Sequence, residues 1–508
     1  MNKYDVAIIG GGVVGAAIAR ELSRYRLKVL LFEKERELAF GVSKSNSGII
    51  HPGTQHPPGL LKARLCVQGN ALTRILAREL FIDFKEVGEL IVAFNDEEAN
   101  RLLKIKKEGS ALGVRGLKIV DMAWLKKNEP NLSDKAVAAL YAPTAGIISP
   151  YRWVYDFAEN AAHNGVEIHI ETKVENILPT KPGFEITTSS GTFRARFAVN
   201  AAGLYADEVS RMAGLDNFKI RPRKGEEFLL DKKDENLTRH LLFPLPSKTS
   251  KGILVTRTSD GNPIIGPTAE DIDDKEDLST TEEGLKKVLE GAKRLVPSVN
   301  ENDIIAYFAG LRPVAGDDFI IRHEDEIPGF INVAGIQSPG LTAAPAIAVM
   351  VAGILKKNGL VMKKKPFFRK HRKREFHLFA IPLDTSTLRH AQGRPEQGRR
   401  TTSSVSTLSI CRRVEETKRL IAKDAGYGDI VCRCEMVSAK EVREAIARGA
   451  RTMDGIKFRT RAQAGRCHGS FCTTRLMKIL SEETGTPLVN VTKRGRGSEI
   501  VKEDRVSG

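Results

Sequence analysis

The N-terminal segment carries the pattern that most constrains the fold. A short run of apolar and β-branched residues at 4–9 precedes three glycines in a G-x-G-x-x-G arrangement, Gly10, Gly12 and Gly15. An apolar segment with helical spacing follows, and a second apolar run ends at Glu33. This order predicts a β-α-β unit whose helix N-terminus faces the phosphates of a dinucleotide. We therefore expect a Rossmann-like α/β domain.

Each residue of this motif has its own task. Gly10 permits the tight turn, Gly12 lets the backbone approach the pyrophosphate, and Gly15 lets helix and strand pack closely. Glu33 lies 18 residues beyond Gly15, where a carboxylate accepts hydrogen bonds from the adenosine ribose. An acid at this position favours FAD or NAD over NADP, whose 2′-phosphate it would repel.

Four further stretches point to a known family. They are SKSNSGIIHPGTQHPPGLLKARLCVQGN from Ser43, FAVNAAGLYAD from Phe197, AGLRPVAGDDFIIR from Ala309 and INVAGIQSPGLTAAPAIA from Ile331. Together they resemble the D-amino-acid oxidase superfamily of FAD-dependent dehydrogenases, above all its 2-hydroxyglutarate and glycerol-3-phosphate dehydrogenase branches. The resemblance covers most of residues 1–360 and implies that the dinucleotide is FAD.

The resemblance also implies how residues 1–360 are organised. The FAD-binding domain would be discontinuous, with an α+β substrate domain inserted into it. The expected FAD parts are about 1–85, 141–220 and 306–360, and the expected substrate parts are about 86–140 and 221–305.

Several cofactor contacts follow from the same resemblance. Asn46 and Ser47 would lie along the ribityl chain and phosphates of the flavin. Val174 would pair its backbone with the adenine, and Gly203 would line the FAD cleft.

The turn before the last apolar helix is implied to bind the flavin ring. Gly340, Leu341 and Thr342 would offer backbone N–H groups to its pyrimidine edge. The position has independent physical sense, because the positive end of a helix stabilises the charge of a reduced flavin. Glycerol-3-phosphate dehydrogenases usually carry a Gly-Gly-Lys-Leu-type turn here, whereas residues 338–342 of this chain read SPGLT and hold no lysine. This turn is more like that of the 2-hydroxyglutarate branch.

Two residues are predicted to act on the substrate. Arg312 resembles the arginine with which this superfamily holds a substrate carboxylate or phosphate, and a planar guanidinium suits that bidentate task. The alternative is an ordinary salt bridge to Asp317 or Asp318. His51 falls where the family places residues beside the flavin, so it is a candidate base for the hydroxyl proton. Its alternative is a loop histidine that only shapes the pocket.

Weaker candidates surround these two. His56, Lys62 and Lys248 are expected at the pocket rim. Arg322 would add a second positive charge for a dianionic substrate, although a solvated charge at a strand end is the favoured interpretation.

Four cysteines near the C-terminus form a separate pattern, Cys432-x-Cys434 and Cys467-x₄-Cys472. Four converging thiolates bind zinc or an iron–sulfur cluster, or form disulfides. The tight C-x-C spacing argues mildly against zinc. The sequences VCRCE and GRCHGSFC resemble the bacterioferritin-associated-ferredoxin-like [2Fe-2S] domain, so this small helical domain is expected to hold a [2Fe-2S] cluster. We assign it residues 420–508, with a core at 430–485, and expect a capped helix from Ser438 to Gly449.

Positive charge is concentrated between these domains. Residues 363–419 hold sixteen Lys and Arg against five Asp and Glu, out of a net charge of +17 for the whole chain. The polar, aperiodic sequence predicts a basic low-complexity linker or insertion over 361–419. A solvated linker is favoured over a nucleic-acid site, and contact with a membrane surface stays open.

These features together predict an FAD-dependent dehydrogenase acting on the CH–OH of a small anionic substrate, with glycerol 3-phosphate narrowly favoured. Electrons would leave through the [2Fe-2S] cluster to a quinone or protein acceptor, with partner oxidoreductase subunits as an open possibility. An L-2-hydroxyglutarate or amino-acid dehydrogenase is the alternative within the enzyme class. The alternative from another class is a basic membrane- or nucleic-acid-binding flavoprotein with a structural Cys₄ site. No apolar run reaches the roughly 20 residues of a spanning helix, so a cytoplasmic protein is expected, at most peripheral on the membrane.

Overall fold

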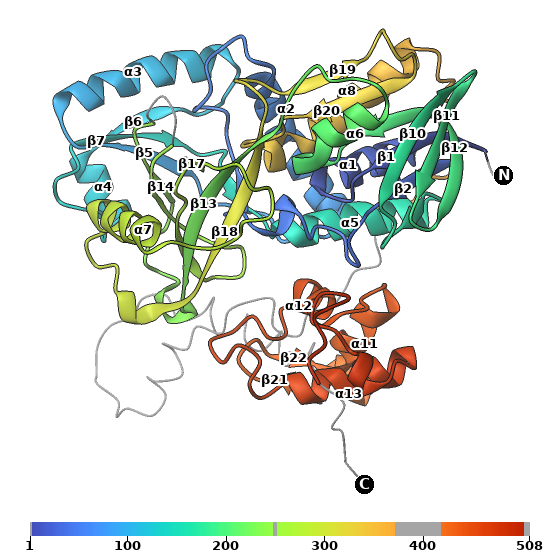
Figure 1. Ribbon diagram of the computed structural model, residues 1–508. Coiled ribbons are helices and arrows are strands. Elements are labelled where there is room, and N and C mark those ends of the chain that lie inside the picture. Colours follow the sequence, from blue (N-terminus) through green and yellow to red (C-terminus); the bar gives the residue numbers. More distant parts are fainter. Residues whose placement is uncertain (1–2, 247–250, 371–417, 502–508) are drawn as a thin grey trace. The chain divides into compact units, whose positions relative to one another are not determined.

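The structure, a computed structural model, describes residues 3–246, 251–370 and 418–501. The chain divides into two compact units, Met1–Lys373 and Arg374–Gly508. The first unit contains two large β-sheets with helices packed on them (Figure 1). The predicted mixed α/β class with a Rossmann-like domain is confirmed.

The first sheet is the nucleotide-binding one. Its parallel part has the order β20-β12-β1-β2-β9, and the antiparallel strands β10, β11 and β19 extend it to eight strands. The central strands are almost wholly apolar because both faces of a parallel sheet are covered. The bounds are β1 Lys3–Ile9, β2 Val29–Phe32, β9 Glu167–His169, β10 Val174–Thr180, β11 Gly183–Thr188, β12 Gly191–Asn200, β19 Ile320–His323 and β20 Phe330–Ala334.

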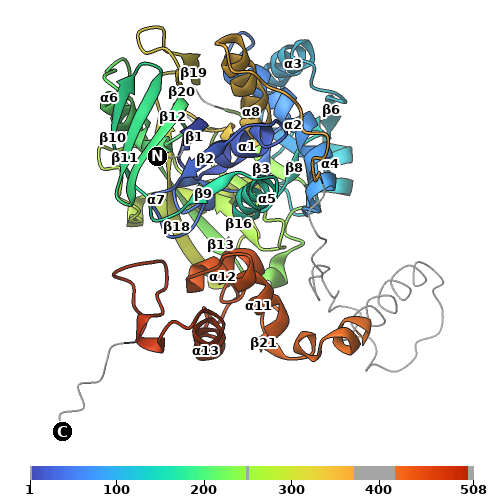
Figure 2. The same ribbon diagram turned by 90° about the vertical axis from the view of Figure 1, so that its right-hand side faces the viewer.

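Five helices belong to this layer: α1 Val13–Leu22, α2 Leu61–Leu80, α5 Pro150–His163, α6 Ala206–Met212 and α8 Gly340–Lys357. Helix α1 packs against α5 and α8, and α2 packs against α8 (Figure 2). By length and composition α8 is the one helix of the described residues that could cross a membrane. Eleven of its 18 residues are buried in the protein, as in a core helix.

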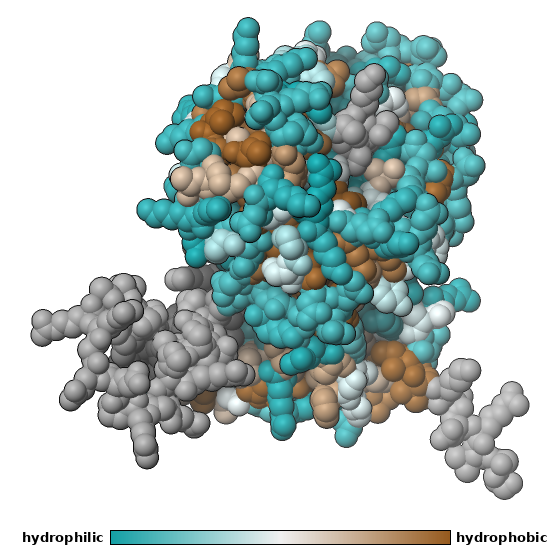
Figure 3. All heavy atoms as spheres, turned by 90° about the vertical axis from the view of Figure 1, so that its left-hand side faces the viewer, coloured by the Kyte–Doolittle hydropathy of each residue, from teal (hydrophilic) through white to brown (hydrophobic). Residues whose placement is uncertain are grey.

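The second sheet has nine strands, and only its β5–β14 pair is parallel. Its order is β17-β13-β16-β15-β14-β5-β7-β6, with β18 paired to β13. Helices α3 Asp96–Ala111, α4 Met122–Asn128 and α7 Glu282–Leu295 pack on it. The strand bounds are β5 Glu89–Ala93, β6 Lys118–Asp121, β7 Ala138–Ala142, β13 Arg221–Leu230, β14 Leu241–Pro244, β15 Leu254–Arg257, β16 Pro263–Gly266, β17 Glu270–Asp271 and β18 Ile304–Val314. On the molecular surface at the side where α3 and α4 lie, hydrophilic residues predominate (Figure 3).

A small three-stranded sheet carries the loop that holds His51. It consists of β3 Ile49–Ile50, β8 Gly146–Ile147 and β4 Lys85–Glu86. Since β3 ends one residue before His51, this sheet fixes where the histidine enters the site.

Residues 361–370 differ from the expectation of a linker starting at 361. An isolated bridge pairs Lys364 with Tyr25, and the backbone N–H of Arg369 donates to Asn164 Oδ1 at 3.0 Å. These bonds attach the segment to the first unit. Sequence composition did not reveal this, because a lysine-rich segment reads as solvated whether or not its backbone is paired.

The second unit is small and helical. It contains β21 Ile430–Cys432, β22 Val437–Ser438, α11 Ala439–Ala447, α12 Met453–Thr460 and α13 Thr473–Thr484. The predicted capping box is confirmed: the Ser438 hydroxyl accepts the N–H of Glu441, whose carboxylate accepts the N–H of Ser438. These helices enclose their own apolar core, which includes Cys432 and Cys472.

Candidate functional site: a flavin site and a four-cysteine centre

At two positions, the glycine turn is packed so tightly that only glycine fits. A Cβ on Gly15 would lie 1.9 Å from the Gly10 carbonyl oxygen, and one on Gly10 would lie 2.4 Å from the oxygen of Ala201. By contrast, a Cβ on Gly12 would approach only the Ser43 hydroxyl, at 3.2 Å. Gly10 and Gly15 therefore hold strand, helix and the β12 end together, while Gly12 keeps the surface beside α1 open.

Glu33 is built into this turn. One carboxylate oxygen accepts the N–H of Gly11 at 2.7 Å and the other accepts that of Glu35 at 2.9 Å. Burial raises the pKa of Glu33 above its ordinary value. The Glu33 carbonyl accepts the N–H of Thr172 at 2.8 Å, two residues before Val174. The structure therefore brings Glu33 and the start of β10, the two predicted adenosine contacts, to one edge of the sheet.

Gly203 follows the end of β12, in a left-handed conformation with φ of 59°. A Cβ there would meet no atom within 4 Å. Its segment lies against the glycine turn, since the N–H of Ala201 donates to the Ile9 carbonyl at 2.9 Å. The position beside the predicted cleft is thus consistent with the expected role.

The loop after β2 reaches the first turn of α1. Ser43 Oγ accepts the N–H of Val13 at 2.9 Å. The Asn46 side chain donates to the Ser43 carbonyl and accepts the N–H of Gly48, both at 2.9 Å, so it shapes the loop. Ser47 donates to Glu227 Oε1 at 2.7 Å. Asn46 and Ser47 therefore lie near the predicted position of the flavin. Their side chains form these hydrogen bonds with other residues of the protein.

The N-terminus of α8 meets the His51 loop. Thr342 Oγ1 accepts the backbone N–H of His51 at 2.9 Å. The Gly340 N–H donates to the carbonyl of Gln337 at 2.7 Å within the turn. Leu341 and Thr342 belong to the first helical turn, whose N–H groups have no acceptor within the helix. The turn predicted to bind the flavin is therefore joined directly to the predicted base.

His51 sits in a buried cluster of charges. Its Nε2 lies 3.3 Å from Lys251 Nζ, and its Nδ1 lies 3.8 Å from Oε2 of Glu89, a carboxylate with no exposed surface. Burial, followed by the charge of Lys251, holds the pKa of His51 well below its ordinary value. The imidazole is therefore neutral at physiological pH and able to accept a proton.

Lys251 links this cluster to the turn before α8. Its Nζ donates to Ser338 Oγ at 3.1 Å. Burial lowers the pKa of Lys251 to about 8, so the side chain is mostly cationic at neutral pH. The lysine that the 338–342 turn lacks in sequence is thus supplied in space by the loop before β15.

Arg312 lies on β18 beside the same cluster. Its guanidinium donates to the Thr268 carbonyl at 3.0 Å, and a Cβ on Gly225 would come within 2.5 Å of it. Burial lowers the pKa of Arg312, and the nearby carboxylate of Glu227 opposes this effect. Burial also raises the pKa of Glu227 to about 7. The ion pairs of the described residues do not join Arg312 to Asp317 or Asp318; Asp318 instead accepts the N–H groups of residues 61 and 62.

The weaker candidates divide into two groups. His56 is partly buried, and burial followed by the charges of Lys251 and Lys62 holds its pKa well below the ordinary value. Lys62 donates to the carbonyl of Asp317 and faces the same region. Arg322 pairs instead with Glu324, and its side chain is 48% exposed. Lys248 lies outside the described residues.

These features fit a flavin dinucleotide. The surface beside Gly12 is open where a pyrophosphate would lie, and the N-terminus of α1 begins there, with its Val13 N–H donated to Ser43. Glu33 stands at the end of β2, where the adenosine ribose would lie. Gly12, Glu33, the loop that carries Ser43, and the α8 N-terminus are therefore the parts that would hold FAD.

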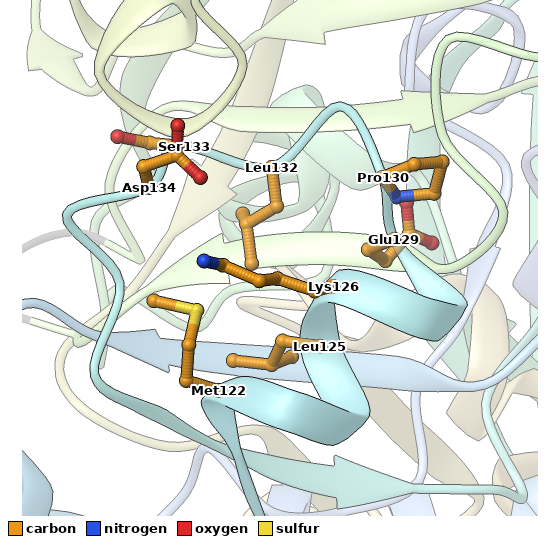
Figure 4. A pocket seen from close by; sticks show the side chains of 8 residues that line it. All are labelled: Met122, Leu125, Lys126, Glu129, Pro130, Leu132, Ser133 and Asp134. Atoms are coloured by element: carbon orange, nitrogen blue, oxygen red, sulfur yellow. The ribbon is translucent and has the colours of Figure 1, made fainter.

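A pocket of about 310 Å³ lies elsewhere, on α4 and the loop after it (Figure 4). Met122, Leu125 and Leu132 give it an apolar wall. Its one buried carboxylate, Glu129, already accepts bonds from the backbone of Arg239 and the ring of His240. Because Glu129 is already committed to these structural bonds, the His51 cluster is the stronger candidate for the active site.

The four predicted cysteines of the second unit come together. The Sγ atoms of Cys432 and Cys434 are 3.9 Å apart, and those of Cys434 and Cys467 are 3.4 Å apart. A hydrogen bond with Cys472 and burial raise the pKa of Cys432. Two thiolates on one tetrahedral ion with bonds of about 2.3 Å lie roughly 3.8 Å apart, so this spacing fits metal or cluster ligation. Glycine is needed at 465, where a Cβ would be 2.6 Å from Cys434 Sγ.

Comparisons with known proteins agree with both sites. Residues 5–354 match the family described as FAD dependent oxidoreductase, and residues 430–482 match the BFD-like [2Fe-2S] binding domain. The chain belongs to the FAD-dependent oxidoreductase family and carries a [2Fe-2S] domain in addition. The predictions of FAD rather than NAD, and of a [2Fe-2S] cluster rather than zinc, are confirmed.

Individual relatives show which enzymes of this family the chain is similar to. The chain is 42% identical to a glycerol 3-phosphate dehydrogenase of Caloramator mitchellensis, over 98% of each chain. It is 30% identical to the mitochondrial L-2-hydroxyglutarate dehydrogenase of Caenorhabditis elegans, over 69% of this chain and 93% of the relative. The FAD-bound structure of L-α-glycerophosphate oxidase from Mycoplasma pneumoniae matches with a TM-score of 0.71 and 33% identity, over 74% of this chain and all of that one.

Sequence reasoning missed three members of the charge cluster, Lys251, Glu89 and Glu227. Lys251 stands in a Ser- and Thr-rich turn, and both glutamates open or occupy strands, so nothing in their local pattern marks them. One signal was available: an acid inside an apolar strand, as in Glu89 before LIVA, is rarely buried without a purpose.

Proposed function

We propose that this protein is a dehydrogenase that oxidises the secondary CH–OH of glycerol 3-phosphate and passes the electrons through the [2Fe-2S] cluster to an acceptor. The observation that carries the proposal is the position of Lys251, which lies 3.3 Å from His51 Nε2, donates to Ser338 in the turn before α8, and is close enough to Arg312 for their charges to interact. The identity to a glycerol 3-phosphate dehydrogenase over nearly the whole chain supports the substrate.

The charges of the cluster suit a phosphate dianion. Burial lowers the pKa of Lys251 most, Cys66 and the carboxylate of Glu89 oppose this effect, and the charges of Arg312 and Lys62 lower the pKa further. Like charges held together in a buried site are costly unless an anion compensates them. A bound phosphate ester would offset that cost, and the guanidinium of Arg312 would hold it at two oxygens.

His51 is the proposed base. The neutral imidazole accepts the hydroxyl proton, and Glu89 Oε2, 3.8 Å from Nδ1, stabilises the cation that forms. Oε2 has no hydrogen-bond partner among the described residues, whereas Oε1 accepts the Thr54 hydroxyl at 2.8 Å. Oε1 therefore fixes the position of the carboxylate, and Oε2 is available to interact with His51.

The cofactors supply the redox chemistry. When bound, FAD accepts a hydride, and a [2Fe-2S] cluster transfers single electrons. The first turn of α8, with Leu341 and Thr342, would stabilise negative charge near it. The acceptor is proposed to be a quinone or a redox protein, and the protein is proposed to act in the cytoplasm or at the inner face of the membrane.

One observation favours a second candidate, L-2-hydroxyglutarate. The SPGLT turn resembles that of the 2-hydroxyglutarate branch, and Arg312 would hold a carboxylate as readily as a phosphate. Lys251 beside Ser338 makes up for the missing lysine, which is why glycerol 3-phosphate is preferred.

The test is anaerobic reduction of the purified holoprotein, followed at the flavin band. Glycerol 3-phosphate is expected to bleach it, and Arg312→Lys is expected to raise the substrate concentration needed by about 10- to 100-fold, because a charged hydrogen bond is lost. Arg322→Lys is the matched control, since its 48% exposed side chain pairs with Glu324. Bleaching by L-2-hydroxyglutarate alone would transfer the assignment to that acid. Reduction by dithionite but by neither substrate would refute both.

A further inference from the structure

Segment 361–370 presents apolar and basic side chains outward from a fixed backbone. Phe367 is 89% exposed, the largest exposed fraction among the large apolar residues described, and Val361 is 66% exposed. The neighbouring Phe368 is held instead: the guanidinium carbons of Arg20 and Arg24 each lie 5.7 Å from its ring centroid. An exposed phenylalanine beside an anchored one is not simply the end of a loose loop.

The backbone around Phe367 is tied on both sides. Before it, the Lys365 N–H donates to the Arg24 carbonyl at 2.9 Å. After it, the Arg369 carbonyl accepts the side-chain N–H groups of Asn160 and Asn164, at 3.0 and 3.1 Å. These bonds hold the backbone on both sides of Phe367 against the turn after α1 and against α5.

The segment that carries this ring is strongly basic, and the carboxylate of Glu21 on α1 lies close enough to Lys364 for the two charges to interact. From residue 356 to residue 374 the sequence holds ten Lys and Arg and no Asp or Glu. Among the described ones, Lys363, Lys364, Arg369 and Lys370 are exposed. The turn that pairs with the segment adds the exposed Arg26 and Lys28.

We propose that segment 361–370 docks the protein on an anionic membrane surface, with Phe367 in the headgroup region and the lysines on the lipid phosphates. An aromatic ring surrounded by amines suits a lipid interface, where each basic side chain near the surface contributes about a factor of five in affinity. A protein partner would instead be expected at a broader apolar patch with a buried centre. The basic side chains could also bind nucleic acid, but that would not account for the exposed apolar side chains of Val361 and Phe367. The proposal goes beyond the substrate assignment and does not depend on it.

The test is co-sedimentation of the full-length holoprotein with sucrose-loaded vesicles. Wild type is expected to bind vesicles containing phosphatidylglycerol and not pure phosphatidylcholine. Phe367→Ser is expected to weaken this binding about tenfold, from lost burial of the ring. Lys363→Gln with Lys364→Gln is expected to weaken it about 30-fold. Leu103→Ser on α3, where the leucine is 56% exposed beside Lys104, is the matched control and should bind as wild type.

A second measurement keeps the proposal independent of binding strength. Phe367→Trp is expected to show a blue shift of tryptophan emission with anionic vesicles only, because the indole enters the interface. Equal binding by wild type and both segment variants would overturn the proposal, as would no binding at all. Binding that transfer RNA or duplex DNA displaces, with no blue shift, would instead assign the segment to nucleic acid. All variants should keep the flavin spectrum and wild-type substrate reduction, so failure of the substrate assignment would be seen separately.

Discussion

Replacing Lys251 by methionine should stabilise the protein at neutral pH while it impairs substrate reduction. Burial lowers the pKa of Lys251 from 10.5 to about 8. Each tenfold loss of proton affinity corresponds to about 1.4 kcal/mol, so keeping this ammonium charged in the folded state costs about 3 kcal/mol at pH 7. An apolar side chain of similar length avoids that cost.

The sign of the pH dependence follows from the same shift. Below pH 8 the lysine is charged in both folded and unfolded protein, and the full cost is present. Between about pH 8 and pH 10.5 the folded protein releases its proton before the unfolded chain does, so stability recovers as the pH rises. The advantage of Lys251→Met should therefore fade across this window.

The assay is thermal unfolding of wild type and Lys251→Met at pH 7 and near pH 10. We expect the variant to melt about 4 °C higher at pH 7, given the size of the unit, and at the wild-type temperature near pH 10. Lys104→Met is the control, because the Lys104 side chain is 78% exposed. A variant that melts at or below the wild-type temperature at pH 7 would refute the argument that the protein tolerates this charge for function.

Three further outcomes are expected. Gly15→Ala should yield protein without bound flavin, because its Cβ would lie 1.9 Å from the Gly10 oxygen; a normal flavin spectrum would contradict this. Cys434→Ser should lose the cluster absorption and keep FAD, with Cys66→Ser as the control that loses neither. Burial raises the pKa of Glu227 to about 7, so ionisation of this carboxyl should lower the melting temperature as the pH rises from 4.5 to about 7. Glu227→Gln should remove this part of the decrease. An unchanged slope would count against that assignment.

The motif residues illustrate what can be predicted from local sequence. Gly10, Gly12, Gly15 and Glu33 form the turn that their spacing predicts, because strand, turn and helix are contiguous and their geometry is local. Ser438 and Glu441 form the predicted capping box for the same reason.

His51 and Arg312 illustrate the limit of such reasoning. Resemblance brought both residues forward, and their roles stay predictions, but it gave no account of what surrounds them. The structure adds Lys251 from one loop and Glu89 from the start of β5, both within 4 Å of the imidazole. Segment 361–370 is a similar case, since composition suggested a linker and backbone pairing attached it to the first unit.

The sequence by itself determined the class of protein: its β-α-β motif predicts a dinucleotide site, and four cysteines in two close pairs, within stretches that resemble a [2Fe-2S] domain, predict a second redox centre. Only the tertiary structure decided the electrostatics of the candidate active site. Whether a lysine is a solvated charge or a buried cation near pKa 8 depends on what encloses it. That enclosure joins residues 51, 89, 251 and 312, far apart in the chain, and no local pattern encodes it.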